Sequence, residues 1–443
     1  MLAKQEHNLV HAIRRSAHPL TGETTDFDPL LKAIGDSRFV LIGEATHGTH
    51  EFYRLRAQIT KRLITEKEFT AVAAEADWPD AYRINQYVRF EGDDEDAIDA
   101  LSGFQRFPAW MWRNADVLDF VGWLRNYNED RHAHRVGFYG LDLYSLHASI
   151  RAVLDFLDKV DPDAARRARY RYACFDNYGE DTQAYGYATS FGLNKSCENE
   201  VISQWMEMRR RAADLARRDG RVPRDAFFFA EQNARLVKNA EEYYRSMFHE
   251  RVSSWNLRDT HMAETLDALG HHLGPTAKVV VWAHNSHLGD ARATEMGQRG
   301  ELNLGQLVRQ RYGREATLVG FTTHSGTVTA ASGWDSPAER KYVRPALPGS
   351  YEALFHQMGT PNFLLRLGKR EEATAALQEP LLERAIGVIY LPRSERASHY
   401  FHAQLPEQFD VVLHYDETRA VEPLERTAEW QTGEVPETYP SML

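Results

Sequence analysis

Short, almost continuously apolar runs recur along the chain, and a polar residue follows most of them. These runs predict strands at residues 39–42, 70–74, 136–139, 278–282 and 317–321, and two later strands at 387–391 and 409–414. Because the runs do not alternate between apolar and polar positions, we expect strands that helices cover on both faces. The pattern is typical of an α/β fold with a central, mostly parallel sheet flanked by helices.

The segments between the strands have helical periodicity. In residues 49–66, apolar side chains recur every three or four positions and form one stripe. No strand pattern occurs from about 151 to 272, where amphipathic stretches predict a large helical insertion that caps the carboxyl ends of the strands. The middle of this insertion, residues 178–192, is rich in Gly, Tyr and Thr and is expected to form a mobile loop. We therefore predict one domain, residues 1–443, with a helical insertion at about 151–272.

Composition narrows the class of protein. The chain has 443 residues, 43% of them hydrophobic, and a formal net charge of −11. Its Lys and Arg residues are scattered, which argues against nucleic-acid binding, and its apolar runs are too short to span a bilayer. Cys174 and Cys197 are its only cysteines. We expect no disulfide framework and a reducing, cytoplasmic location.

The most informative motif follows the first long apolar run and reads Gly43-Glu44-Ala45-Thr46-His47-Gly48. A carboxylate and an imidazole leave this strand end together, between two glycines that permit a sharp turn or a close approach. Histidine and glutamate are the side chains most often used to move protons near neutral pH. In sheets of this kind, ligands bind beyond the carboxyl ends of the strands.

Other predicted strands end in similar residues, namely Glu75, Asp142, His284 and His287. Since parallel strands bring their carboxyl ends to one edge, we expect an acid–base cluster there. Polar residues also end strands for no functional reason, so each position alone is equally compatible with an ordinary loop or helix cap.

Arg56 lies close to the apolar stripe of helix 49–66, whereas Arg54 points roughly the opposite way. A buried unpaired charge is very costly, so Arg56 must snorkel to solvent or pair with a carboxylate. Two interpretations stay open: a structural salt bridge, or a fixed cation that holds a catalytic glutamate or a developing oxyanion. His50 projects away from the stripe, at the rim of the site or on the surface.

Several common catalytic motifs do not occur in the sequence. There is no Gly-x-Ser-x-Gly elbow, no P-loop, no Gly-x-Gly-x-x-Gly after a strand and no His-Glu-x-x-His. The chemistry that fits is that of His and Glu acting on water.

The ordered set of motifs resembles the erythromycin esterase family. The matching pieces are Gly43 to Gly48, Arg56, Ala74-Glu75, Gly137-Phe138-Tyr139-Gly140-Leu141-Asp142, Trp282-Ala283-His284-Asn285-Ser286-His287 and Ser398-His399-Tyr400-Phe401. The resemblance covers nearly the whole chain. It implies an α/β fold with a helical lobe and hydrolysis of carboxylic esters, including the macrolide lactones that characterised members open, with antibiotic resistance as the associated role.

The resemblance also implies roles for particular residues. His47 would be the general base that activates water, and the other core residues would be Glu44, Arg56, Glu75 and His284. Around them we place His50, Asp142, His287, Arg258 and His399 as substrate-binding or supporting residues. We expect no cofactor and no metal, and an ester or lactone as substrate. The details resemble those of a branch whose members are often joined to a phosphoribosyltransferase domain. We expect no such domain here, since no phosphoribosyl-pyrophosphate motif is evident, and a phosphoribosyltransferase encoded elsewhere is an expected partner.

Two other functions are compatible with the same residues. The His and Glu cluster could bind a divalent metal that lowers the pKa of water, in which case chelation would abolish activity. A distant relative of this fold binds haem, so the cleft could be a non-catalytic binding site. A Soret band lost in the His47→Ala variant would then be expected.

Overall fold

The computed structural model describes all residues except 1, 133, 216–223, 249–250, 370 and 434–443. The sequence also predicts a loose C-terminal tail at residues 431–443, and most of this segment lies outside the described residues. Contacts within the chain define two compact units. Unit 1 comprises Met1–Val72, Tyr87–Gly137 and Ala277–Leu443, and unit 2 comprises Ala73–Gln86 and Phe138–Thr276. A single domain with an insertion stays a prediction.

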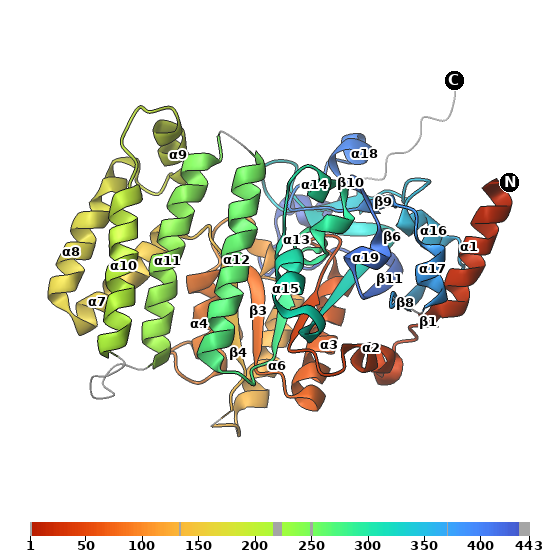
Figure 1. Cartoon of the computed structure of the whole chain (residues 1–443), viewed down its shortest axis with the longest axis horizontal. Helices are drawn as coiled ribbons and strands as arrows, with labels where there is room; N and C mark the ends of the chain where they lie inside the picture. Colours follow the sequence, from red (N-terminus) through yellow and green to blue (C-terminus); the bar gives the residue numbers. More distant parts are fainter. Residues whose placement is uncertain (1, 133, 216–223, 249–250, 370, 434–443) are drawn as a thin grey trace. The chain divides into compact units, whose positions relative to one another are not determined.

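Unit 1 is built on a mostly parallel sheet flanked by helices, which confirms the predicted fold class (Figure 1). Its strands are β1 (Ala17–Pro19), β2 (Phe39–Ile42), β5 (Val279–Trp282), β6 (Ala316–Ala330), β7 (Glu339–Val343), β8 (Asn362–Arg366) and β11 (Val411–Thr418). Their order is β1-β8-β11-β6-β2-β5, with β7 beside β6. The central pairs β2–β5, β2–β6 and β6–β11 are parallel, whereas β8 is antiparallel to both of its neighbours.

The remaining elements of unit 1 are short connections and helices. They are α1 (Leu2–Ser16), α2 (Asp28–Ile34), α3 (His50–Lys67), α5 (Ala97–Leu101), α6 (Ala115–Asn128), α13 (Asn285–Leu288), α14 (Glu295–Gln298), α15 (Leu304–Tyr312), α16 (Tyr351–His356), α17 (Glu372–Ala376), α18 (Glu395–Ser398), α19 (Leu405–Gln408), α20 (Ala428–Thr432) and the two-stranded sheet of β9 (Leu381–Arg384) and β10 (Tyr400–Ala403). Strands β3 (Ala71–Asp77) and β4 (Gly137–Asp142) begin in unit 1 and continue in unit 2.

Helix α3 forms because its apolar stripe packs on the sheet. Phe52, Ile59 and Leu63 are each 0% exposed, and the ring of Phe52 contacts that of Phe321 on β6. Arg56 is buried on the same face, whereas Arg54 is exposed, as the periodicity predicts. The helix ends where Glu68 takes a left-handed conformation, φ 60°.

Several predicted strand boundaries were wrong, including that of β11, which continues to Thr418. Strand β3 continues to Asp77 and β4 to Asp142, so Glu75 and Asp142 lie inside strands. Strand β6 continues to Ala330, which places His324 within it, because its second half pairs with β7. Residues 387–391 form only an isolated bridge at Ile389, and the strand in this region is β9.

Unit 2 contains a bundle of helices, and its long members lie side by side in Figure 1. The helices are α4 (Trp78–Val88, whose last two residues belong to unit 1), α7 (Leu146–Val160), α8 (Pro162–Tyr172), α9 (Thr182–Ser190), α10 (Glu198–Leu215), α11 (Arg224–Ser246) and α12 (Arg251–Leu273). Helix α7 packs on α8 and α11, and α11 packs on α9, α10 and α12. The helical segment therefore occurs where the sequence predicts it, while its position over the strand ends stays a prediction.

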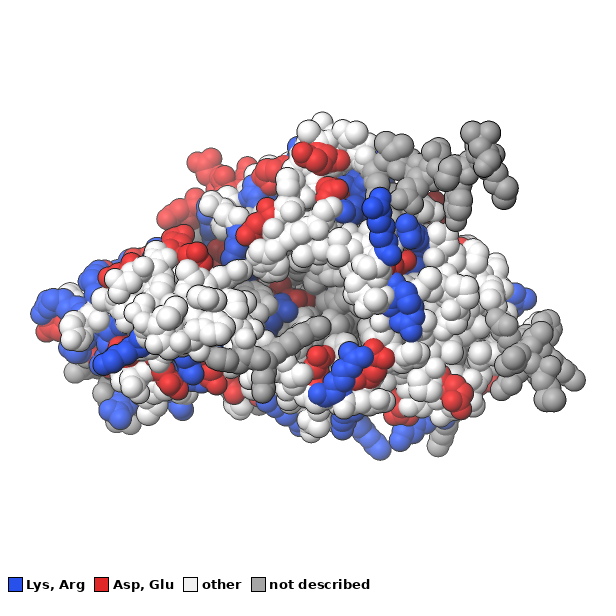
Figure 2. Space-filling view, turned by 90° about the horizontal axis from the view of Figure 1, so that it is seen from above, with Lys and Arg blue, Asp and Glu red and all other residues white. Residues whose placement is uncertain are grey.

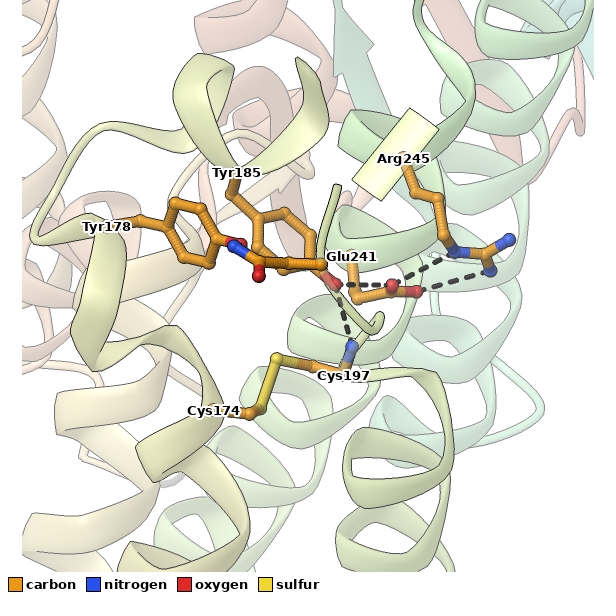
Figure 3. The surroundings of a disulfide bond; sticks show 7 residues. Cys174, Tyr178, Tyr185, Cys197, Glu241 and Arg245 are labelled. Carbon is orange, nitrogen blue, oxygen red and sulfur yellow. Dashed lines mark hydrogen bonds and ion pairs between the residues drawn. A yellow bond between two sulfur atoms is a disulfide. The ribbon is translucent and has the colours of Figure 1, made fainter. Parts of the chain in front are cut away.

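The expected mobile loop at 178–192 is instead mostly helical, because tertiary contacts hold it. Asp181 caps α9 by accepting a hydrogen bond from the backbone of Ala184. The buried Tyr185 hydroxyl donates to Glu241, at 2.7 Å, and accepts from the backbone N–H of Cys197, at 2.8 Å (Figure 3). Polar groups of three segments are thus joined at one point.

Cys174 and Cys197 form a disulfide beside this tyrosine, contrary to the expectation drawn from the cysteine count (Figure 3). Their Cα atoms lie 5.9 Å apart although 23 positions separate them in sequence. The chain between them turns back through α9, which brings Cys174, two residues after α8, beside Cys197, one residue before α10. Spacing alone cannot reveal this. The pairing also removes the argument on which the cytoplasmic expectation rested, since disulfides persist mainly in oxidising compartments.

Replacing both cysteines by alanine is expected to lower the free energy of unfolding of unit 2 by about 3 kcal/mol, the loop-closure value for a loop of this length. Urea unfolding followed by circular dichroism measures the change. Dithiothreitol should shift the wild-type curve in the same direction and leave the double variant unchanged. Two free thiols in the denatured, non-reduced wild type would contradict the assignment.

On the face drawn in Figure 2, Lys and Arg side chains are interspersed with Asp and Glu, including over the helical unit at the left. Unit 2 also contains charged side chains that pair with one another; Arg167 and Arg171, for example, both contact Glu207 at 2.6 Å. Mixed charges of this kind are typical of a solvated surface. Among the described residues, no helix combines the length and the apolar composition needed to cross a bilayer.

Candidate active site

The loop between β2 and α3 is held on both sides by backbone hydrogen bonds. The N–H of Gly43 donates to Val319 on β6, and the carbonyl of Glu44 accepts from Asn285, both at 2.8 Å. On the other side, Ala45 and His47 bond to the backbone of Ile386 at 2.8 and 3.3 Å. The side chains of Glu44 and His47 therefore leave a backbone that is fixed at the carboxyl end of β2.

The two glycines of the motif allow neighbouring segments to pack directly against the backbone of the loop, and neither glycine has a positive φ. A Cβ on Gly43 would lie 2.2 Å from the Asn285 side-chain oxygen, and one on Gly48 would lie 1.8 Å from the carbonyl oxygen of Thr329. Any larger residue would push the loop away from the strands that hold it.

Glu44 and His47 form a buried acid–imidazole pair. The Nδ1 atom of His47 lies 2.9 Å from Oε1 of Glu44, and the two residues are 7% and 1% exposed. An ionised carboxylate only accepts hydrogen bonds, so Nδ1 of a neutral His47 carries the hydrogen. The lone pair is then on Nε2, which is the arrangement that a general base requires.

Arg56 pairs with the other oxygen of the Glu44 carboxylate. Of the two alternatives for this buried cation, the structure therefore shows pairing with a carboxylate and not snorkelling to solvent. Its Nη1 lies 3.2 Å from Oε2 of Glu44, and its side chain is 0% exposed. The guanidinium also lies over the rings of Tyr53 and Trp282, 4.5 and 4.9 Å from their centroids. Arg56 thus orients the Glu44 carboxylate through an ion pair, while the two rings hold its guanidinium in place by cation–π contacts.

His284 lies beside His47 at the end of β5, where it caps the short helix α13. The centroids of the two imidazole rings are 4.8 Å apart, and His284 is 3% exposed. Its Nδ1 accepts the backbone N–H of Ser286 at 3.2 Å and lies 2.8 Å from the Ser286 hydroxyl. Since Nδ1 is an acceptor, Nε2 of the neutral ring carries the hydrogen and is a donor. With these tautomers, the two histidines present complementary groups, a lone pair on Nε2 of His47 and an N–H on Nε2 of His284.

Asn285 is a site residue that sequence reasoning missed. Its side-chain amide donates to the carbonyl of Phe321 at 2.7 Å and accepts from the N–H of the same residue at 3.3 Å. Because its own N–H bonds to Glu44, Asn285 ties the Glu44 loop to β6. The signal available in the sequence was a polar residue three positions after the apolar run that ends at Trp282, whereas its 0% exposure is visible only in the structure.

Unit 2 brings together three further predicted residues, Glu75, Asp142 and Arg258. The Arg258 guanidinium contacts Oε1 of Glu75 at 2.6 Å and both oxygens of Asp142 at 3.0 and 2.7 Å. It also lies over the ring of Tyr144, 4.9 Å from the centroid, and burial raises the pKa of the Tyr144 hydroxyl. One cation therefore holds two buried carboxylates in place.

The other predicted residues have separate surroundings. His50 lies between Asp116, at 2.8 Å from its Nδ1, and Arg419, at 2.7 Å from its Nε2. His399 accepts the backbone N–H of Leu391 at 3.0 Å; burial lowers its pKa to about 4, so the ring is neutral and supports a turn. His287 is buried within α13.

A buried network on β9 was also missed. Arg384, 0% exposed, donates to the Tyr400 hydroxyl at 2.8 Å and to the carbonyls of Arg344 and His324 at 2.9 and 3.0 Å. Its neighbour Glu383 is also 0% exposed. Burial, with a contribution from the nearby Glu352, raises the pKa of Glu383 to about 8, so this carboxyl is neutral at pH 7.

The raised pKa of Glu383 predicts how stability depends on pH. The folded protein retains a proton that the unfolded chain loses above pH 4.5, so stability falls as the pH rises from 4.5 to about 8. Glutamine does not titrate, so this contribution is absent from a Glu383→Gln variant. Relative to the wild type, its free energy of unfolding should increase by up to about 1.4 kcal/mol per pH unit across this window. Urea unfolding at pH 5 and pH 8 measures the difference. Exposed Glu379→Gln is the control, and equal pH dependence in wild type and Glu383→Gln would contradict the prediction.

The fold and the site define an α/β protein with a buried carboxylate, imidazole and guanidinium in contact at a strand end. The model of the erythromycin esterase family matches residues 64–418, which is more than half of the chain. The chain therefore belongs to the erythromycin esterase family. The matched range includes Glu75, Arg258 and His284 but begins after Glu44, His47 and Arg56.

Two curated relatives extend the similarity. YbfO of Bacillus subtilis is named as a hydrolase. It is 22% identical to this chain over 433 residues, which cover 93% of this chain and 91% of YbfO. Erythromycin esterase type II of Escherichia coli is 24% identical over 335 residues, covering 69% of this chain and 73% of its own. Family membership and these relatives support a hydrolase.

Solved structures show the same fold. A Bacillus cereus protein superposes with a TM-score of 0.80 at 20% identity and covers 95% of this chain and 99% of its own. A mutant erythromycin esterase in an open conformation superposes with a TM-score of 0.68 at 16% identity and covers 95% of this chain and 98% of its own.

Proposed function

We propose that the protein hydrolyses carboxylic esters or lactones, with His47 as the general base. The observation that supports this most directly is the 2.9 Å contact between Nδ1 of His47 and Glu44, whose other oxygen pairs with Arg56. This arrangement leaves the Nε2 lone pair of a buried imidazole as the basic group, with its tautomer and orientation fixed. Hydrolysis of an ester requires such a base to activate water.

The reaction proceeds by direct attack of water. Nε2 of His47 takes a proton as the water oxygen bonds to the ester carbonyl carbon, and the carbonyl oxygen becomes an oxyanion. The N–H of His284 is the candidate donor to this oxyanion, since its Nδ1 is occupied by Ser286. The tetrahedral intermediate then expels the alkoxide, which receives the proton from His47. The products are a carboxylic acid and an alcohol, joined in one molecule when the substrate is a lactone.

In this proposal Arg56 acts on Glu44. Its guanidinium is enclosed by Tyr53 and Trp282, and it pairs with the carboxylate that orients His47. As His47 becomes an imidazolium, the adjacent Glu44 carboxylate stabilises the new positive charge.

A substrate panel tests the proposal. The purified protein is incubated with erythromycin, with p-nitrophenyl acetate and with simple lactones, and the products are identified by mass spectrometry. We expect turnover of at least one ester class, and ring-opened erythromycin if macrolides are substrates. Turnover of simple esters with intact erythromycin would restrict the proposal to a non-macrolide esterase. No turnover of any ester, lactone or macrolide by a folded sample would reject it.

A further inference from the structure

Unit 1 contains a second cluster of ligating side chains that the proposed reaction does not use. It consists of His324 on β6, His356 at the end of α16 and Asp416 on β11. One nitrogen from each histidine and one carboxylate oxygen all lie within 4.8 Å of one another. Helix α16 packs against both strands, so three separate elements converge here.

The contacts within this cluster are close. Nδ1 of His356 lies 2.8 and 2.9 Å from the two carboxylate oxygens of Asp416. The rings of His324 and His356 stack with centroids 3.9 Å apart and an interplanar angle of 6°. Nδ1 of His324 is buried and has no hydrogen-bond partner among the residues that the structure describes. A buried polar atom without a partner is costly, and a ligand that it could bind would remove that cost.

A supporting layer lies behind the cluster. Nε2 of His414 approaches Asp416 at 3.5 Å, and Nδ1 of His414 lies 2.9 Å from the hydroxyl of Thr322. The His414 side chain is 0% exposed. Outer groups that orient a carboxylate in this way are typical of metal sites, where they fix the direction of the ligand.

We propose that His324, His356 and Asp416 bind a divalent transition metal, with zinc as the best match. Two imidazole nitrogens and one carboxylate oxygen are a common zinc donor set, and a water molecule would complete four-coordination. Zinc holds such donors at about 2.0–2.1 Å, so the three atoms must move together and the stacked rings must tilt on binding. His356 can make this movement because its side chain is 50% exposed at the end of a helix.

The bound metal would fasten α16 to β6 and β11. The expected signature is binding of one equivalent of Zn²⁺ to the metal-free wild type, measured by isothermal titration calorimetry, with a higher melting temperature. Co²⁺ should give visible absorption bands of a site with nitrogen and oxygen ligands. Both signals should be lost in His356→Gln and in His324→Gln. Melting curves recorded without metal show whether each variant is folded.

The matched control is His402→Gln. His402 is also 50% exposed and contacts a carboxylate, that of Glu295, at 3.2 Å, yet it belongs to no three-ligand group among the described residues. This variant should bind Zn²⁺ as the wild type does. Binding of one equivalent of Zn²⁺ by both His356→Gln and His324→Gln, as in the wild type, would overturn the proposal. Loss of Zn²⁺ binding only in His284→Gln would also overturn it, because the metal would then lie at the proposed hydrolytic site. The titration measures no hydrolysis, so its outcome is independent of the proposed function.

Discussion

A His47→Gln variant is expected to lose ester hydrolysis by a factor of about 10²–10⁴, the usual contribution of a general base. Glutamine keeps a side chain of similar size and can still contact Glu44, but it cannot accept a proton from water near neutral pH. The loss should appear in kcat, because the base acts on the reacting water. Initial rates on the best ester of the substrate panel measure the effect.

Two variants complete this test. His402→Gln removes an exposed histidine that also pairs with a carboxylate, and it should hydrolyse at the wild-type rate. Glu44→Gln should retain part of the activity. The imidazole of His47 is still present as the base, but the negative charge that orients it is lost. A His47→Gln variant that is folded, by its melting curve, and still has wild-type kcat would assign the base to another residue.

Replacing Arg56 by methionine is expected to lower the free energy of unfolding by about 3–5 kcal/mol, the range found when one member of a buried ion pair is removed. The Glu44 carboxylate, 2% exposed, would be left without its cation, and the contacts of the guanidinium with Tyr53 and Trp282 would also be lost. Hydrolysis should fall as well, because Glu44 would no longer hold His47. Urea unfolding and kcat are measured on the same samples.

The same helix provides the matched control, since Arg54 is exposed two positions earlier. Arg54→Met should change stability by less than about 0.5 kcal/mol, as is usual for surface substitutions. The double variant Glu44→Gln, Arg56→Met should recover part of the stability, because it leaves no buried charge. Equal stability of the Arg54 and Arg56 single variants would show that the ion pair contributes little.

Local patterns were sufficient to predict the architecture. Continuous apolar runs located β2, β3, β4, β5, β6 and β11, and three-to-four-residue periodicity located α3 and the long helices α10, α11 and α12, whereas α9 was predicted as a loop. The orientation of Arg56 also followed from periodicity, because the angle between successive residues of a helix is nearly constant. Strand ends were less predictable: β6 continues to Ala330 because β7 pairs with it, and this partner is distant from residues 317–321 in sequence.

Local sequence patterns could not predict which polar groups contact one another. The sequence shows two cysteines but not that α8 and α10 bring them to 5.9 Å, and it shows a Gly- and Tyr-rich segment but not that Tyr185 anchors it to Glu241. Likewise, the raised pKa of Glu383 arises from burial and from Glu352, neither of which the residues around position 383 reveal.

By itself, the sequence determined the fold class, the helical segment and the Glu44–His47 motif with its neighbour Arg56, since these depend on patterns within one or two elements. The tertiary structure alone decided that Arg56 pairs with Glu44, that Nδ1 of His47 faces the same carboxylate, and that Ser286 occupies Nδ1 of His284. The physical reason is that periodicity determines which face of an element is buried, whereas a hydrogen bond or ion pair requires two particular atoms to lie within about 3 Å. Only the folded chain sets those positions, both within a loop and between elements.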